Sequence, residues 1–436
     1  MSRFAVIVAV LVFAGCTTVP TTVQPVNDAH VREHPEQYLV LAVKNDADAS
    51  YAHAGSTVRG YDSNHEYAQS ARARKLLKEI AVEYQLESID SWPIQLLAMQ
   101  CVIFKPVGTE SGATLINKLQ RDPRVLLAQP LQNFSTNSTP ANPEPDSYQS
   151  LQQSLRRMDI VNAHRWSRGR GINVAVIDTG MDINHPDLKG RITEQRNLVD
   201  DDQQQFARDR HGTAVAGVIA ADASNASGII GIAPEANLIA LKACWQLQAN
   251  RDDARCNTFT LAKGIANAVQ LHAQIINLSV VGPDDALLTA LVKQAQRAGI
   301  VIVGAKDASD ENRFPASLPD VIGVSSMELR EAHEELVSAP GRDVLTLLPG
   351  GRYDFASGNS IATAEVTGTI ALLMARDKHN LDSAQLKKIL LQNTESSSID
   401  NLASINACRA LSQLLGQPGC DHSRIDSTST AKSIAQ

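Results

Sequence analysis

Residues 358–368 read Gly-Asn-Ser-Ile-Ala-Thr-Ala-Glu-Val-Thr-Gly and continue into an apolar run over residues 369–375. Small and apolar residues recur there at helical spacing, so the stretch predicts a buried helix. Ser360 falls in its first turn, where a helix presents unpaired backbone N–H groups and about half a positive charge. A serine so placed can attack a carbonyl carbon while its own N–H holds the oxyanion. For this stretch alone, a capping serine on a core helix is the simpler alternative.

The composition limits the classes of protein to which this chain can belong. The chain has 436 residues, enough for two or three domains. It is 43% hydrophobic and 20% charged, as in soluble globular proteins. A net charge of −7 gives no indication of a nucleic-acid partner. Aromatic residues make up only 4%, which favours a tightly packed α/β core over an aromatic binding surface.

Four of the six cysteines form two local pairs, Cys244 with Cys256 and Cys408 with Cys420. Each pair closes a short loop, and no Cys-x-x-Cys or Cys/His metal spacing is present in the sequence. In an oxidising compartment this pattern predicts two disulfides, and the alternative is four unrelated thiols. Cys101 falls within a predicted strand and is expected to be a buried free thiol.

The N-terminus has the features of an export signal. Arg3 precedes an apolar run that is too short to span a bilayer, so residues 1–16 are predicted to be a signal peptide. The ending Phe-Ala-Gly-Cys resembles a bacterial lipobox, which implies cleavage before Cys16 and attachment of lipid, including palmitate, to that residue. An ordinary signal peptide with a chance cysteine is the alternative. Residues 17–36 are expected to form a flexible tether.

Residues 37–134 alternate strand and helix patterns. Strands are predicted at 38–43, 96–104 and 125–130, and helices at 70–84 and 112–121. This order favours a small ferredoxin-like α+β sandwich. Turn formers and prolines then fill residues 135–150, which are predicted to be a linker exposed to proteolysis.

Two further stretches carry candidate catalytic groups. Residues 171–180 form a nearly continuous apolar run ending in Asp178, as expected for a strand buried on both faces of a parallel sheet. Functional carboxylates lie at such strand ends, although Asp178 alone could simply begin a turn. His211 opens a helix of small residues over 211–221. A charged histidine gains nothing at this helix end, so a neutral base held by a carboxylate is the better interpretation.

The order Asp178, His211, Ser360 is one of those that serine hydrolases use. The three blocks around these residues are similar to the signature blocks of subtilisin-like serine proteases, and segments 231–236, 276–279 and 338–341 match as well. The resemblance covers residues 151–415 and leaves 416–436 as a tail. It implies an α/β, three-layer parallel-sheet catalytic domain preceded by a small α+β ferredoxin-like prodomain, which acts as an inhibitory propeptide.

The resemblance also assigns roles. Ser360 is the nucleophile, His211 the general base, and Asp178 the group that orients the imidazole. No cofactor is required. The residues expected to bind substrate are Leu278, Ser279, Val280, Val281, Gly282 and Ala305. Val281 replaces a family glycine, so a narrowed first pocket is expected.

Two family features are altered or incomplete. The asparagine that serves as side-chain oxyanion donor is absent, and we expect Asp307 to take its place beside the Ser360 N–H. Lys306, Asn312, or a hole formed by the Ser360 N–H alone remain alternatives. Asp187 and Asn225 match two calcium ligands of the family, so a structural calcium ion is an option. Ordinary polar turn residues are the other reading, because calcium takes six to eight oxygens.

The leading hypothesis is a serine endopeptidase anchored by lipid in a bacterial cell envelope, at the outer membrane or cell surface. Its substrate is a peptide or protein, and its own propeptide is an intramolecular inhibitor. Self-cutting within 135–150 would convert this zymogen and release the catalytic domain from the membrane. The alternatives are a degenerate subtilase that serves as an envelope binding or scaffold protein, and an esterase or transferase that uses the same triad.

Overall fold

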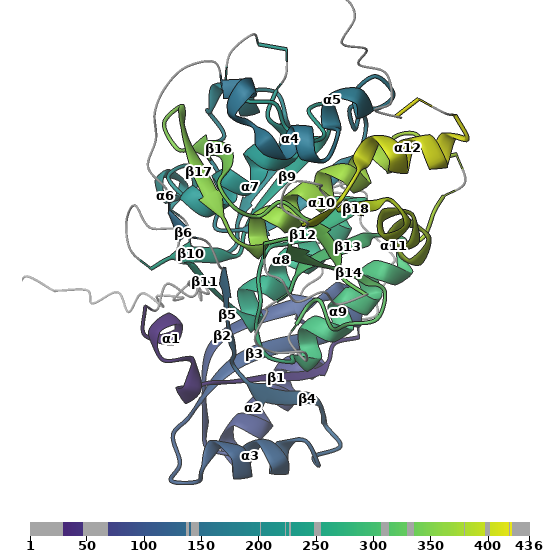
Figure 1. Ribbon diagram of the computed structural model, residues 1–436. Coiled ribbons are helices and arrows are strands. Elements are labelled where there is room, and N and C mark those ends of the chain that lie inside the picture. The colour runs from purple at the N-terminus through teal and green to yellow at the C-terminus, as the bar shows by residue number, and fades with distance from the viewer. Residues whose placement is uncertain are drawn as a thin grey trace, which may run out of the picture.

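The computed structural model describes residues 29–46, 69–136, 139–140, 148–200, 202–222, 224–225, 228–247, 254–306, 314–328, 335–378, 380–396, 402–417 and 419–420. A large parallel sheet with helices on both faces forms the main body, and a small sheet with two helices lies beside it (Figure 1). The predicted signal peptide, with Cys16, lies outside the described residues.

The large sheet has seven strands in the order β15-β14-β13-β12-β7-β9-β8. Every neighbouring pair in it is parallel. The chain enters at β7 and builds first toward β8 and then, from β12, toward β15. The carboxyl ends of β7 and β12 therefore flank the point where strand order reverses, which is where doubly wound sheets form their sites. The strands are β7 Asn173–Asp178, β8 Ile192–Asn197, β9 Asn237–Lys242, β12 Ile275–Leu278, β13 Val301–Ala305, β14 Val321–Ser326 and β15 Val337–Ala339.

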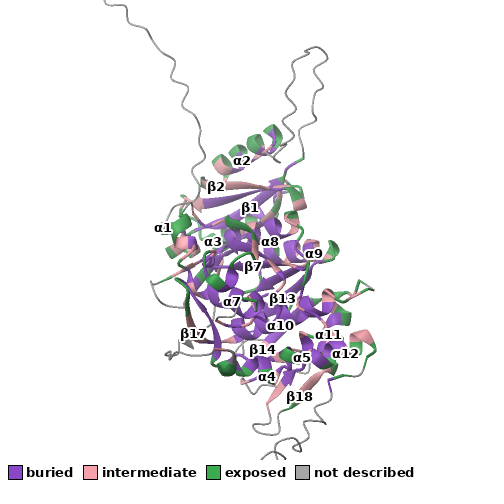
Figure 2. Cartoon of the chain, turned by 90° about the horizontal axis from the view of Figure 1, so that it is seen from above, coloured by how far each residue is buried: buried purple, intermediate pink, exposed green. Residues whose placement is uncertain are grey.

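Helices cover both faces of this sheet. Val174 and Val176 of β7 share one apolar core with α7 (Arg210–Ala220) and α10 (Asn359–Met374). The alternate residues Ala175 and Ile177 belong to a second core with α8 (Thr258–Gln270) and α9 (Ala286–Arg297). Because successive strand residues point to opposite faces, this split confirms the three-layer arrangement. Figure 2 shows the sheet and these helices mostly buried.

The small sheet is antiparallel in the order β2-β3-β1-β4, with α2 and α3 as crossovers. This confirms the ferredoxin-like α+β fold. The elements are β1 Leu39–Lys44, α2 Ala71–Glu83, β2 Leu86–Ile94, β3 Met99–Pro106, α3 Gly112–Leu119 and β4 Val125–Pro130. The sequence did not predict β2, because its polar residues and Pro93 hide the strand pattern. The strand predicted to begin at 96 begins at Met99, after a 3-10 turn over Gln95–Leu97.

The small sheet packs against α8 and α9. Val40 and Ile103 share a core with Leu287 and Leu288 of α9. Polar groups add to the interface: the Leu287 N–H donates to Gln129 Oε1 at 3.3 Å, and Lys263 Nζ lies 3.7 Å from Asp90 Oδ2. Cys101 is buried here as a free thiol, as predicted, and burial raises its pKa to about 12.

The remaining elements are short. Residues 29–36 of the predicted tether are not irregular: they include a helix with Val31 fully buried, and Arg32 lies 3.6 Å from Asp200. Among the described helices, none is both long and apolar enough to cross a bilayer. The other elements are α1 Ala29–Glu33, η1 Pro35–Gln37, β5 Asn133–Thr136, β6 Thr139–Pro140, η3 Tyr148–Leu151, α4 Gln153–Arg157, α5 Ile160–Ala163, η4 Pro186–Leu188, α6 Gln203–Phe206, β10 Cys244–Gln246, β11 Ala254–Asn257, β16 Val344–Leu348, β17 Arg352–Ser357, α11 Ser383–Gln392, β18 Thr394–Ser396, β19 Ala403–Ile405 and α12 Ala407–Leu415.

Both predicted disulfides are present. Cys244–Cys256 joins β10 to β11 with their Cα atoms 4.2 Å apart, and Cys408–Cys420 ties the start of α12 to the chain beyond it. Each crosslinks residues that are 12 positions apart in the sequence. The first disulfide therefore holds β11 against β10.

A buried carboxyl on α10 predicts a pH-dependent stability. The pKa of Glu365 is raised from its ordinary 4.5 to about 8, mainly by burial; a hydrogen bond with Ser154 lowers it and the nearby charge of Glu328 raises it. Because the folded-state pKa is the higher one, the stability contributed by Glu365 is complete below pH 4.5 and is lost as pH rises toward 8. Glu365→Gln cannot ionise, so its stability relative to wild type should rise by about 3 kcal/mol between pH 4 and pH 7.

Denaturant unfolding of both proteins at the two pH values measures this difference, with Ser360→Ala in each to prevent autolysis. An equal pH dependence of the unfolding free energy in both proteins would mean that Glu365 is hydrated or already charged in the folded chain.

Candidate active site

Asp178 is the last residue of β7, and its carboxylate is 1% exposed. Its Oδ1 accepts a hydrogen bond from His211 Nδ1 at 2.7 Å and another from the Thr179 N–H at 2.7 Å. The sequence predicted this placement from an apolar strand that ends in an acid. The carboxylate therefore holds the imidazole by one ring nitrogen and fixes its orientation.

His211 is the second residue of α7 and is also 1% exposed. The next residue, Gly212, donates its N–H to Thr179 Oγ1 at 3.1 Å. A Cβ at Gly212 would lie only 2.0 Å from the Gly180 carbonyl oxygen. Glycine is required here because the start of the helix must approach the end of β7 this closely for His211 to reach Asp178.

Ser360 is the second residue of α10 and is 1% exposed. Its Oγ donates to the carbonyl oxygen of Ser279 at 3.0 Å, and Ser279 Oγ donates back to the Ser360 carbonyl at 3.1 Å. Ser279 directly follows β12, so Ser360 sits at the carboxyl end of that strand. Helix α10 packs against α7, which carries His211. The three predicted catalytic residues thus lie on elements that meet at the strand-order reversal.

The first turn of α10 is anchored by Asn359. Its side-chain oxygen accepts from the Ser326 N–H at 2.8 Å, and its side-chain nitrogen donates to the Lys306 carbonyl oxygen. These contacts join the helix start to the ends of β13 and β14. Asp307, the expected oxyanion donor, and Asn312 lie outside the described residues. Lys306 is buried and lines a hollow with Glu335 and Lys387.

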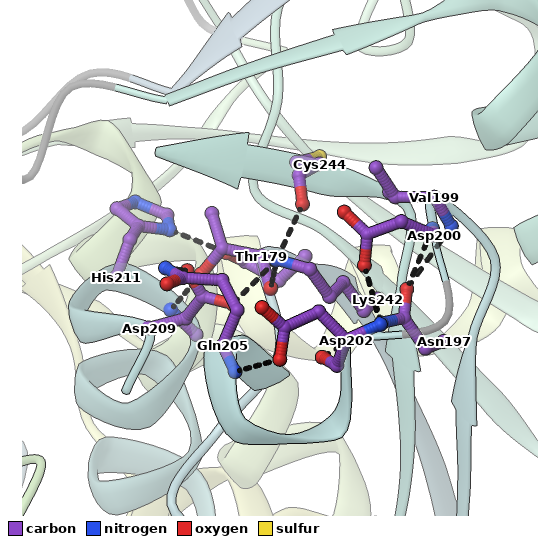
Figure 3. A network of polar contacts seen from close by, with 12 residues as sticks. Thr179, Asn197, Val199, Asp200, Asp202, Gln205, Asp209, His211, Lys242 and Cys244 are labelled. Carbon is purple, nitrogen blue, oxygen red and sulfur yellow. Dashed lines mark hydrogen bonds and ion pairs between the residues drawn. The ribbon is translucent and has the colours of Figure 1, made fainter. Parts of the chain in front are cut away.

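A buried ion pair lies beside the Asp178 end of β7, and Figure 3 shows its residues, Lys242 and Asp209, with Thr179 and His211. Lys242 Nζ lies 2.5 Å from Asp209 Oδ2, and both side chains are fully buried. The ammonium also donates to the carbonyl oxygens of Thr179 at 2.5 Å and Cys244 at 3.2 Å. Burial raises the pKa of Asp209 to about 6, although Lys242 opposes the shift.

This pair connects the chain just after Asp178 with the chain just before His211. Thr179 follows Asp178, and Asp209 stands two positions before His211. The sequence did not predict a role for this pair. The available signal was a lone lysine within the apolar run of β9, since an unpaired charge is rarely buried in a core strand.

The residues expected to bind substrate lie at the ends of two strands: Leu278 ends β12, residues 279–282 follow it, and Ala305 ends β13. Leu278, Val280, Val281 and Ala305 are buried, and Gly282 bridges to Phe314 through two backbone hydrogen bonds of 3.1 and 2.9 Å. A Cβ at Gly282 would lie 1.9 Å from the ring of Phe134. Glycine at 282 therefore makes room for an aromatic side chain that comes from the segment preceding the main body.

That segment pairs with two strands of the main body. Strand β5 (133–136) pairs antiparallel with β11, and Phe134 is 1% exposed. Strand β6 (139–140) pairs antiparallel with Ala356 and Ser357 at the end of β17. Ser357 is followed by Gly358, Asn359 and Ser360. The predicted linker thus contains strand residues on both sides of positions 137–138, which lie outside the described residues.

Asp187 and Asn225, the two calcium candidates, lie together but are arranged as a hydrogen-bond cluster. Asp187 Oδ1 accepts from Asn225 Nδ2 at 2.7 Å, and Oδ2 accepts from the Ile229 N–H at 3.0 Å. Burial raises the pKa of the Tyr353 hydroxyl, and the charge of Asp187 and its hydrogen bond to that hydroxyl raise it as well. Within the described residues, no group of three or more His, Cys, Asp or Glu could hold a metal ion. Residues 223, 226 and 227, beside Asn225, lie outside the described residues, and calcium binding stays an untested prediction.

The comparisons with known proteins agree with this geometry. Residues 169–422 match the model of the subtilase family. The chain is 36% identical to the intracellular serine protease of Paenibacillus polymyxa over 248 residues, 52% of this chain and 74% of that protein. It is 32% identical to the thermophilic serine proteinase of Bacillus sp. (strain AK1) over 283 residues, 62% of this chain and 68% of that protein.

A solved structure shares the fold. Fervidolysin of Fervidobacterium pennivorans, a keratinolytic enzyme related to subtilisin, superposes with a TM-score of 0.64 at 20% identity. The match covers 86% of this chain and 60% of the fervidolysin chain, so this chain spans somewhat more than half of that protein. The family match includes all three candidate catalytic residues. The chain belongs to the subtilase family.

Proposed function

We propose that this protein is a serine endopeptidase that hydrolyses peptide bonds through Asp178, His211 and Ser360. The observation that carries the proposal is the buried 2.7 Å hydrogen bond between Asp178 Oδ1 and His211 Nδ1. A carboxylate in this position fixes the imidazole tautomer, leaves Nε2 to act as the base, and stabilises the imidazolium. Neither the site nor the comparisons favour a degenerate binding protein over this function.

In the proposed reaction, Ser360 Oγ leaves its hydrogen bond to the Ser279 carbonyl and gives its proton to His211 as it attacks the substrate carbonyl. The Ser360 N–H, at the start of α10, is the oxyanion donor, with Asp307 as the expected second donor. His211 then protonates the leaving amine, and an acyl-enzyme forms on Ser360. Water hydrolyses this ester in the second half of the reaction.

Labelling by a fluorophosphonate probe tests the nucleophile. We expect the probe to label Ser360 in the folded wild-type protein and to leave Ser360→Ala unlabelled. Ser396→Ala is the matched control, because it removes an exposed hydroxyl on β18 and should keep the label. Absence of labelling in folded wild type would contradict the proposal, and so would labelling of Ser360→Ala.

We further propose that the chain is its own first substrate. The backbone of 133–136 adds to β11, and that of 139–140 adds to β17 three residues before Ser360. A chain held in extended form on both sides of a nucleophile has the geometry of a bound peptide substrate. The cut is therefore expected between Thr136 and Thr139. The small sheet on α8 and α9 would act as the inhibitory propeptide until it is released.

Expression of the full chain tests self-processing. Wild type should yield a fragment whose new N-terminus, determined by mass spectrometry, lies between residues 137 and 139, whereas Ser360→Ala should stay full length. Cell fractionation should find the N-terminal fragment in the membrane and the larger fragment released, because Cys16 is the proposed lipid anchor in a bacterial envelope. Full-length wild type in the membrane, or a cut outside residues 136–139, would contradict this scheme.

A further inference from the structure

The hairpin of β10 and β11 connects the end of β7 to the segment that is proposed to be cut. Its first strand is fixed next to Asp178. The Ala243 N–H donates to the Asp178 carbonyl oxygen at 2.8 Å, and Lys242 Nζ donates to the Cys244 carbonyl oxygen at 3.2 Å (Figure 3). Strand β10 therefore begins at a defined position relative to the proposed catalytic carboxylate.

Strand β11 is held by fewer contacts of its own. It is the middle strand of a three-stranded sheet in the order β10-β11-β5, separate from the seven-stranded sheet (Figure 1). It pairs with β10 at three positions, and one of these pairs is the disulfide Cys244–Cys256. A two-stranded ribbon is only marginally stable without further support. The disulfide supplies such support at the end of β10 that is fixed next to Asp178.

The crosslink lies one residue before a helix cap. Asn257 ends β11 and caps α8, where its side-chain oxygen accepts from the Thr260 N–H at 2.9 Å. The cap fixes the position of this end of β11. The disulfide at Cys256 fixes the direction in which the strand extends from it, because two neighbouring residues are then tied to different elements.

The segment that is proposed to be cut lies on the other edge of β11. Phe134 of β5 is directly opposite Cys256. Its side chain and both cysteines share one apolar core, and none of the three is more than 1% exposed. The Phe134 ring also meets the Phe314 ring edge to face, with the ring centroids 5.4 Å apart. A shift of Cys256 would therefore displace the strand partner of the residue that anchors this segment.

We propose that Cys244 and Cys256 are positioning residues for the proposed endopeptidase: their disulfide holds β11 in place as the edge that receives the backbone of a substrate. The proposal rests on the proposed self-processing, in which residues 133–136 are the first such segment. A substrate then docks on a strand that is already ordered, which lowers the entropic cost of binding. The disulfide acts on binding through β11, and proton transfer through His211 does not use it.

The second disulfide of the chain is a matched control. Cys408 and Cys420 are also 12 positions apart in the sequence, and both are buried. Their crosslink begins on α12, which packs against α5, α10 and α11. Removing it takes one crosslink of the same sequence separation from other elements, so a general loss of stability can be separated from an effect on β11.

Hydrogen exchange measured by mass spectrometry tests the link between the disulfide and the strands without catalysis. In the full chain carrying Ser360→Ala, Cys244→Ser/Cys256→Ser should raise the exchange rate of the β5 amides about tenfold, as when one residue of a strand loses its order. Fragments from β12 and α10 should exchange at an unchanged rate. The control variant Cys408→Ser/Cys420→Ser should leave the exchange of β5 unchanged.

A second replacement separates the covalent bond from the volume that it fills. Cys244→Ala/Cys256→Val keeps apolar side chains in the core but has no crosslink, so its β5 amides should exchange as fast as in the serine variant. Exchange as slow as in the parent chain would show that packing alone holds β11, and would overturn the proposal. An equal rise in exchange over the whole chain would overturn it as well.

Kinetics of the proteins collected after self-cutting give the functional result. For a peptide with the sequence of residues 131–140, KM should rise about tenfold in the serine variant while kcat stays within about twofold, since the lost interaction serves binding alone. The control variant should match wild type. The rate at which a fluorophosphonate probe labels Ser360 should be equal in all three proteins, because this small probe needs no strand edge.

These measurements distinguish the role of the disulfide from the proposed function. An unchanged KM in the serine variant would contradict the positioning role. Slower labelling of Ser360 in that variant would contradict it too, because the crosslink would then hold the catalytic residues themselves. Wild type that neither cuts the peptide nor takes up the probe would contradict the endopeptidase function, whereas unchanged exchange of β5 would remove the role of the disulfide whatever the chain catalyses.

Discussion

Replacing His211 by alanine is expected to lower kcat for peptide hydrolysis about 10⁶-fold, the loss seen when a serine protease loses its base. The Ser360 hydroxyl has no useful nucleophilicity near neutral pH unless a base takes its proton. His211 is the titratable group that both the sequence pattern and the Asp178 hydrogen bond identify for this task. Substrate binding should be little changed, so the loss should fall on kcat and leave KM within a few-fold.

Asp178→Asn tests the residue that orients His211, and it should lower kcat by a smaller factor than His211→Ala. It keeps the size of the side chain but favours the wrong imidazole tautomer, and the expected loss in kcat is about 10⁴-fold. The double variant should be no slower than His211→Ala, because the two residues act as a unit. Steady-state kinetics on a fluorogenic peptide measures all three. A loss under 100-fold for folded His211→Ala would remove His211 from the mechanism.

The sequence allowed the main fold to be predicted because its signals are local. An apolar run ending in Asp178, small residues around His211 and the helical spacing after Ser360 each specify one element without reference to the others. Strand β2 was missed for the opposite reason. Its polar residues become strand only because they pair with β3, and β3 itself was predicted to begin too early.

The parts of the site that the sequence did not predict depend on remote pairing. Strand β5 joins β11, about 120 positions further along the chain, and β6 joins β17 more than 200 positions further. Residues 135–150 are mostly turn formers and prolines, so little in the local sequence marks β6 or the second half of β5 as strand. In the same way, the pairing of Lys242 with Asp209 depends on the parallel register of β7 and β9, which puts Lys242 opposite Asp178.

The Lys242–Asp209 pair leads to the second large expected effect. Each side chain is fully buried, and the ammonium has three acceptors within 3.2 Å. Removing one partner of such a pair leaves the other charge buried without compensation, which typically costs about 3–5 kcal/mol. Removing both partners together costs much less, because an apolar core tolerates a matched replacement. The pair is therefore expected to be a strongly coupled unit.

Lys242→Met is expected to lower the free energy of unfolding by about 3–5 kcal/mol at pH 8, and Lys242→Met/Asp209→Leu by clearly less. Denaturant unfolding measures both in a Ser360→Ala background. The loss of unfolding free energy in Lys242→Met should be smaller below pH 6 than at pH 8, since Asp209 is then protonated in both proteins and the wild type loses its ion pair.

Lys242 also donates to the carbonyl of Thr179, next to Asp178. In the single variant that keeps Ser360, kcat should therefore fall by a larger factor than KM rises. A double variant as unstable as the single one would show that Lys242 acts through packing, with no dependence on the charge of Asp209.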